Sequence, residues 1–189
     1  EGDEFTAEVV AEVLETDVRA IVNKLGAELS REGGLICEVG LQEVQGKELN
    51  KYYFRHSLFR DYLFDSLSQA QQRQFHEEIG TALERIYGHS ITQIAPQLAY
   101  QFAQTNKRDK AILYLLLAGD QARKSYALQE AIEFYQRALV LMKAKRDFKQ
   151  SAQTLMKMGL TYHIAFEYGK SHRAYDEGFA LWQQTNLFD

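Results

Sequence analysis

The sequence predicts a mainly helical fold, with a small β-hairpin near the N-terminus followed by helical hairpins that stack on one another. Three observations support this. Apolar residues recur at helical spacing over most of the 189 residues. Short runs rich in β-branched and aromatic residues interrupt that spacing only between positions 35 and 54. One proline and 12 glycines leave no room for a long flexible linker. We expect two domains, residues 1–88 and 89–189.

The composition predicts a soluble, cytoplasmic protein. With 46% hydrophobic residues, the chain can bury one large core or two small ones. No run approaches the roughly 18 apolar residues of a membrane span, and the acidic start Glu1-Gly2-Asp3-Glu4 is unlike a signal peptide. The single cysteine, Cys37, cannot form an internal disulfide, and we expect it to be a small buried apolar group.

The segment from Glu1 to Phe54 has the element order of a winged helix. Two amphipathic helices are expected after the N-capping residues Thr6 and Thr16, and the second ends at Gly33-Gly34. A short strand follows at residues 35–39, and a second strand at residues 52–54. The polar stretch between them, residues 40–51, is interpreted as the loop that forms the wing.

From Leu58 to the end, the chain is predicted to be helical. Ser68 and Gln71 have the spacing of a capping box, and Gly88 is placed to end the helix that they begin. Within residues 110–126, the run 112–117 is apolar nearly all round, which is typical of a helix covered on more than one side.

An internal repeat is the most specific signal in the chain. Small, small, aromatic and small residues recur at offsets of 12, 16 and 19, in two clear copies that begin at Gly119 and Gly159. Small residues where helices touch, with an aromatic residue between them, are typical of a helical hairpin. The first copy is Gly119, Ala131, Tyr135, Ala138; the second is Gly159, Ser171, Tyr175, Gly178; a weaker upstream copy is Ala99, Ala111, Leu115, Ala118.

These offsets resemble the tetratricopeptide repeat, over about residues 90–185. The segment Met158-Gly159-x-x-Tyr162 also resembles the Leu-Gly-x-x-Tyr segment of that family. The interval from Gly119 to Gly159 is longer than the family's period of about 34 residues, and the usual proline near the repeat end is missing. We therefore expect a longer turn between repeats, at residues 143–149. The implied architecture is an α-α superhelix of tetratricopeptide-like hairpins.

A wider resemblance covers nearly the whole chain. It is carried by Gly2-x-x-Phe5, by Tyr53-Phe54-Arg55-His56-Ser57-Leu58-Phe59-Arg60-Asp61, by Ser66-Leu67-Ser68 and Phe75-His76, by residues 110–120, and by Glu130-Ala131-Ile132-x-x-Tyr135-x-x-Ala138-Leu139. These segments resemble the region after the nucleotide-binding domain in bacterial STAND-type signal-transduction ATPases, including those associated with cyclases or transcription regulators. The resemblance implies a fragment, with an ATPase core before Glu1, ATP or ADP bound there, no cofactor in the fragment itself, and more repeats after Asp189.

The resemblance also points to His56. In that family a histidine at the start of the helix after the second strand can touch the nucleotide phosphate, and His56 matches this position. Ser57 stands where many relatives have aspartate. A neutral imidazole can donate a hydrogen bond to phosphate. The alternative interpretation is a half-buried His56 that caps the helix beginning at Ser57.

The predicted function is a non-catalytic regulatory and protein-interaction module of a larger signalling ATPase. The repeats would bind a protein or peptide, and the winged helix would couple to the ATPase domain of the same full-length chain. No phosphate loop, zinc-ligand spacing or nucleophile elbow supports an enzyme. The middle repeats are basic and could receive an acidic peptide or the acidic first third of the chain; Arg123, Lys124 and Arg137 are the tentative partner-binding residues.

The alternative is a DNA-binding winged-helix transcription regulator with a helical-repeat sensor domain. Residues 1–50 carry twelve acidic side chains against four basic ones, which repels phosphate. The expected recognition helix, residues 17–32, has no net charge, and neither has the wing. Nucleic acid is therefore not the expected partner. The sequence leaves open a homodimer formed through the apolar C-terminal end.

Overall fold

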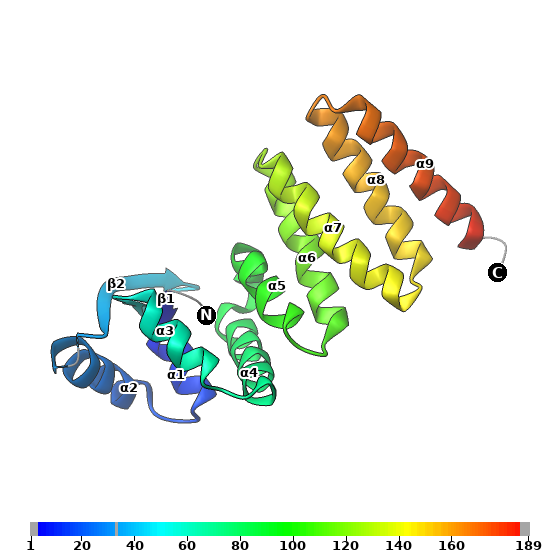
Figure 1. Ribbon diagram of the computed structural model, residues 1–189. Coiled ribbons are helices and arrows are strands. Elements are labelled where there is room, and N and C mark those ends of the chain that lie inside the picture. The colour runs from blue at the N-terminus through cyan, green and yellow to red at the C-terminus, as the bar shows by residue number, and fades with distance from the viewer. Residues whose placement is uncertain (1–3, 33, 186–189) are drawn as a thin grey trace. The chain divides into compact units, whose positions relative to one another are not determined.

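The computed structural model describes residues 4–32 and 34–185 (Figure 1). As predicted, this part of the chain is mainly helical, with a small antiparallel sheet before most of the helices. The chain divides into two compact units, Glu1–Asn106 and Lys107–Asp189, whereas the sequence predicts a division after residue 88. Among the described residues, no helix is long and apolar enough to cross a membrane.

The sheet has three strands: β1 (Glu4–Thr6), β2 (Ile36–Val44) and β3 (Lys47–Phe54). They pair antiparallel in the order β1-β3-β2, and β1 was not predicted. The prediction of a polar loop at residues 40–51 is wrong, because Gly40 pairs with Lys51 and Val44 with Lys47. Only Gln45 and Gly46, with φ of 52° and 74°, form the turn, as a two-residue hairpin requires.

Two helical segments follow β1. Helix α1 (Ala7–Val13) begins after Thr6 as predicted. Helix α2 (Val18–Lys24) is capped by Asp17 instead of the predicted Thr16, because the Asp17 carboxylate accepts the N–H groups of Arg19 at 2.9 Å and Ala20 at 3.2 Å. The expected single helix continues as a π-helix, η1 (Leu25–Glu32). Gly33, one of the two predicted stop residues, lies outside the described residues.

These elements enclose a small core in which α1, α2 and η1 pack on the sheet. Its buried members are all apolar or aromatic: Ala7, Ala11, Ile21, Leu25, Ile36 and Tyr52. Tyr52 is the largest of them and stacks against Phe5 of β1, with ring centroids 5.9 Å apart. The missed strand β1 therefore supplies part of the first unit's core.

The rest of the first unit consists of α3 (Ser57–Asp65), α4 (Gln69–Tyr87), the 3-10 helix η2 (Gly88–Ile94) and α5 (Ala95–Ala103). The predicted capping box at the start of α4 is confirmed: Gln71 N–H donates to Ser68 Oγ at 3.3 Å, and Ser68 N–H donates to Gln71 Oε1 at 3.0 Å. Gly88 ends α4, as predicted, with φ of 43°.

Up to residue 185, the second unit has four helices of nearly equal length, α6 (Arg108–Lys124), α7 (Leu128–Lys145), α8 (Phe148–Ile164) and α9 (Tyr168–Thr185). Each of the last three runs back along the helix before it (Figure 1). The repeat spacing predicts the contacts in both hairpins correctly. A Cβ atom added at Gly119 would lie 2.6 Å from the Tyr135 ring, and one added at Gly159 would lie 2.6 Å from the Tyr175 ring. The helices approach this closely because glycine has no side chain.

Three similar turns join these helices. Tyr126, Arg146 and Phe166 each adopt a left-handed conformation, with φ of 61°, 59° and 60°. The N–H of the following residue donates to a carbonyl of the preceding helix, from Ala127 to Ala122, from Asp147 to Met142 and from Glu167 to Tyr162, at 2.9, 3.0 and 2.9 Å. This is the Schellman motif. The longer turn predicted at residues 143–149 is wrong, because the additional residues lengthen the helices instead.

Candidate interaction surfaces

Helix α3 has no buried residue. Four large hydrophobic side chains lie on one side of it and are mostly in water: Leu58 is 80% exposed, Phe59 49%, Tyr62 75% and Leu63 54%. We call these four residues the α3 surface. Single exposed hydrophobic residues are common, but a contiguous group on one short helix is typical of a docking site.

A cavity of about 400 Å³ separates α3 from the helices beside it. Phe64, near the end of α3, bridges the gap and meets the His76 ring of α4 edge-on at 5.6 Å. The floor of the cavity is polar, because the buried His76 Nδ1 lies 2.7 Å from Gln101 Oε1. Helix α3 therefore contacts α4 through Phe64 and contributes no buried residue to the core.

An apolar groove of about 340 Å³ lies beside this cavity, between α1, η1, the sheet and α4. Phe54 and Ile79 line both the groove and the cavity under α3. All of the lining residues are apolar: Phe5, Val9, Val10, Val13, Leu14, Leu25, Leu29, Ile36, Phe54 and Ile79. The first unit therefore has an apolar groove in addition to the exposed side chains of the α3 surface.

His56 occupies the N-cap position of α3, but its side chain makes no capping hydrogen bond. The residue is exposed, and its ring lies 6.1 Å from the ring of Phe59. The interpretation of His56 as a half-buried capping residue is therefore wrong. Its exposed imidazole lies directly beside the α3 surface, and its role as a nucleotide sensor stays a prediction.

The predicted partner-binding residues lie on two helices of the second unit. Arg123 and Lys124 are in the last turn of α6, whereas Arg137 is near the middle of α7. Lys124 and Arg137 are exposed, but Arg123 is half-buried and its Nε is shielded from water. Arg123 is thus the least accessible of the three to a partner.

Arg123 lies beside a polar network that was not predicted from the sequence. Tyr135 Oη of α7 donates to Asp120 Oδ1 of α6 at 2.7 Å, and Lys157 Nζ of α8 donates to Asp120 Oδ2 at 2.6 Å. Burial alone would raise the pKa of Asp120, but the hydrogen bonds from Lys157 and Tyr135 outweigh it and lower that pKa. Burial and the neighbouring Asp120 raise the pKa of Tyr135. The network ties three helices together.

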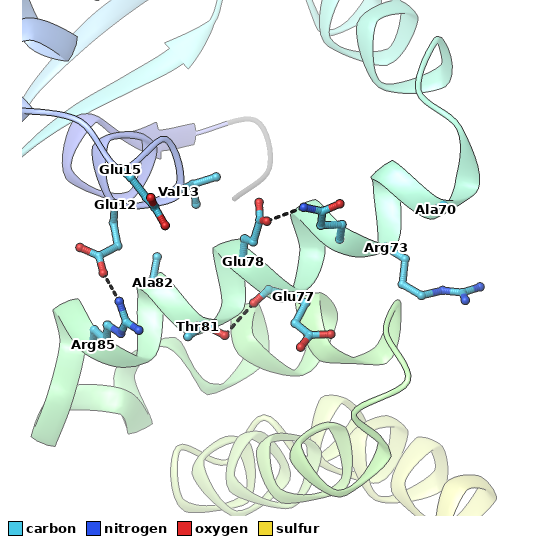
Figure 2. A pocket seen from close by; sticks show the side chains of 11 residues that line it. Glu12, Val13, Glu15, Ala70, Arg73, Glu77, Glu78, Thr81, Ala82 and Arg85 are labelled. Atoms are coloured by element: carbon cyan, nitrogen blue, oxygen red, sulfur yellow. Dashed lines mark hydrogen bonds and ion pairs between the residues drawn. The ribbon is translucent and has the colours of Figure 1, made fainter.

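A surface cleft of about 530 Å³ lies between the end of α1 and α4 (Figure 2). Four carboxylates and two guanidinium groups line it: Glu12, Glu15, Glu77, Glu78, Arg73 and Arg85. Glu12 and Arg85 form an ion pair at 2.5 Å, which links the two helices. Among the described residues that line the cleft there is no histidine, cysteine or serine, so they form no histidine-activated nucleophile.

Cys37 is half-buried and not fully buried as predicted. Arg55 Nε donates to its Sγ at 3.4 Å. Hydrogen bonding to Arg55, and then to Tyr53, lowers the pKa of the thiol. Across residues 4–32 and 34–185, no group of three histidine, cysteine or carboxylate side chains is arranged to hold a metal ion.

Comparison with known proteins identifies a long, distant relative. No family model matches the chain. The protein is 23% identical over 146 residues to one from Rhizobium meliloti (strain 1021) whose name is "Uncharacterized protein R02095". The match covers 76% of this chain but 14% of that protein, so the chain spans about one seventh of its relative's length.

Proposed function

We propose that this chain is a non-catalytic regulatory and protein-interaction module of a larger signalling ATPase. In this proposal the first unit is a winged helix that docks on the ATPase domain of the full-length chain. The second unit is a stack of tetratricopeptide-like hairpins that binds a protein or peptide. The single observation that carries the proposal is the α3 surface, which leaves four large apolar side chains in water on a helix with no buried residue.

The energetics of α3 favour a partner. Burying one large apolar side chain contributes about 1.5–3 kcal/mol, so the α3 surface holds several kcal/mol that a docked protein would gain. Because isolated helices shorter than about 12 residues are marginal in water, this nine-residue helix also gains order when it is covered.

Two further observations support the finer assignments. The first unit contains β1, then two helical segments, then a β-hairpin, and its three strands lie in the order β1-β3-β2. This order of elements is consistent with a winged helix. The Gly119–Tyr135 and Gly159–Tyr175 contacts are those expected of tetratricopeptide-like hairpins. His56 at the start of α3 would let one surface respond both to the ATPase domain and to its nucleotide phosphate.

The test is light scattering behind a sizing column, with the chain mixed with the nucleotide-loaded ATPase domain of the same gene. The double variant Leu58→Asp, Tyr62→Asp should abolish a complex that the unchanged chain forms. His56→Ala should weaken the complex with ATP more than without nucleotide. The matched control is Leu113→Asp, Val140→Asp, which changes two exposed apolar residues of the second unit and should leave the complex intact.

A complex that survives the α3 double variant would show that docking uses another surface. No complex at all, together with tight and salt-sensitive binding of duplex DNA, would instead support the DNA-binding alternative.

A further inference from the structure

One edge of the second unit gathers basic residues from three helices. Helix α6 begins there, α7 ends there and α8 begins there. An ion pair between Asp109 and Lys145 joins the start of α6 to the end of α7. The turn at Arg146 and Asp147 leads directly on to α8. We call the basic residues at this place the basic edge: Lys107, Arg108, Lys110, Lys143, Lys145, Arg146 and Lys149.

The basic edge keeps exposed cations beside its ion pairs. Glu177 pairs with Lys143 at 2.6 Å, and Asp109 pairs with Lys145. Asp147 is engaged at the start of α8, where it accepts the N–H of Gln150 at 3.0 Å. The side chains of Arg108, Arg146 and Lys149 lie outside these pairs, and all three residues are exposed. An anionic partner could therefore reach them from solvent.

The turn geometry does not explain the charge at Arg146. The two equivalent positions, Tyr126 and Phe166, adopt the same left-handed conformation with aromatic side chains, and they lie at the opposite edge of the hairpins. Glycine is the residue that this conformation favours, and a longer side chain there strains the backbone. The backbone conformation of this turn therefore does not require an arginine.

We propose that the basic edge binds an acidic polypeptide segment. The inference rests on the proposed function, and it names the chemistry of the partner that the second unit takes. Alternating cations and carboxylates suit recognition of a peptide, because the carboxylates fix which positions an acidic side chain can occupy. A nucleic-acid backbone, with a phosphate at every step, would instead be repelled at Asp109 and Asp147.

The length of the basic edge agrees with this choice. Neighbouring helices pack about 8–10 Å apart, so three helix ends span roughly 20 Å, the length of about six extended residues. The net charge of −4 attracts neither anion at long range, so binding must come from the local positive charge of the edge. A short acidic peptide is therefore the ligand that fits the edge.

The test is fluorescence anisotropy with a fluorescein-labelled peptide of eight glutamates, added to the chain at about 20 mM salt, where screening is weak. The edge variant is Arg108→Glu, Arg146→Glu, Lys149→Glu. The control variant is Gln121→Glu, Gln129→Glu, Lys170→Glu, Arg173→Glu, which alters exposed residues near the end of α6 and the starts of α7 and α9 and changes the net charge equally. We expect the edge variant to weaken binding at least about tenfold and the control less than about threefold.

Two further measurements check that the variants are folded and that the edge prefers peptide to DNA. Thermal unfolding followed by circular dichroism checks that each variant is folded, and glutamine replaces glutamate at the same three positions if the edge variant is not. A short DNA duplex is titrated in parallel and should bind more weakly than the peptide. The proposal is overturned if the peptide does not bind, if both variants weaken it equally, or if DNA binds more tightly. Because these titrations contain no ATPase domain, their failure is distinct from failure of α3 docking.

Discussion

The two hairpins of the second unit share a backbone plan but differ in how their central tyrosine is held. Tyr135 is fully buried and its hydroxyl donates to Asp120, whereas Tyr175 is only half-buried. The position that corresponds to Asp120 in the second hairpin is Leu160, whose side chain cannot accept a hydrogen bond from the Tyr175 hydroxyl. The apolar contacts therefore repeat, while the polar network exists only where α8 packs against the first hairpin.

The largest difference should appear when a methyl group is added at the close contacts. Gly119→Ala would overpack the fully buried Tyr135 ring at a cost of about 3 kcal/mol, and the better helix propensity of alanine returns about 1 kcal/mol, for a net loss of about 2 kcal/mol. Gly159→Ala should be close to neutral, because the half-buried Tyr175 can move aside. Urea unfolding of both variants measures the difference, and equal losses would contradict it.

The next effect concerns Asp120 itself. Asp120→Ala leaves the buried Tyr135 hydroxyl without its acceptor and should reduce the free energy of unfolding by about 1.5 kcal/mol. The control is Asp109→Ala, which removes an ion pair of an exposed carboxylate and should change stability by less than about 0.5 kcal/mol. Similar losses in both variants, measured by urea unfolding, would show that Asp120 acts only as a surface charge.

A smaller effect is expected for the tyrosine hydroxyls. Tyr135→Phe removes a single hydrogen bond and should destabilise the chain by about 1 kcal/mol. Tyr175→Phe should leave the melting temperature nearly unchanged, because the second hairpin has leucine where Asp120 stands in the first. A larger loss for Tyr175→Phe than for Tyr135→Phe would reverse the comparison.

The smallest effect is on the response to acid. The pKa of Asp120 in the folded chain lies below its usual value of 3.8, so its ionised form stabilises the fold. That contribution is complete above the usual pKa and is lost as the pH falls through the lower, folded-state pKa. The stability advantage over Asp120→Asn should therefore narrow on acidification below about pH 4. An advantage that stays constant from neutral to acid pH would exclude this role.

The helical repeat could be predicted from the sequence because its signals are local and recur. Gly119 with Tyr135, and Gly159 with Tyr175 at the same offset, are sufficient to place two close helix contacts. The network at Asp120 could not be predicted in the same way. It depends on Lys157, which lies on another helix and has no counterpart in the first copy of the repeat.

The β-hairpin was predicted, but its extension through residues 40–51 was missed for a different physical reason. Its strands alternate between polar residues and a few buried apolar ones, Val44 and Leu49, so the segment resembles a loop until the pairing is known. The Gln45-Gly46 turn was the available signal, because glycine beside a residue that tolerates positive φ favours a two-residue hairpin. The exposure of α3 was equally hidden, since its apolar spacing is the same as that of a buried helix.

The left-handed turn residues Tyr126, Arg146 and Phe166 recur at equal intervals, so one helix with its turn is the unit of length in this region. A deletion or insertion therefore keeps the glycine–tyrosine contact only when it spans two such units. Removing residues 127–166 would join α6 to α9 and place Tyr175 against Gly119, so the interlocking pair would be kept. Removing only residues 127–146 would join α6 to α8 and bring Leu155 to that place instead. Insertions and deletions of two units preserve the alternation of small and aromatic faces, and those of a single unit destroy it.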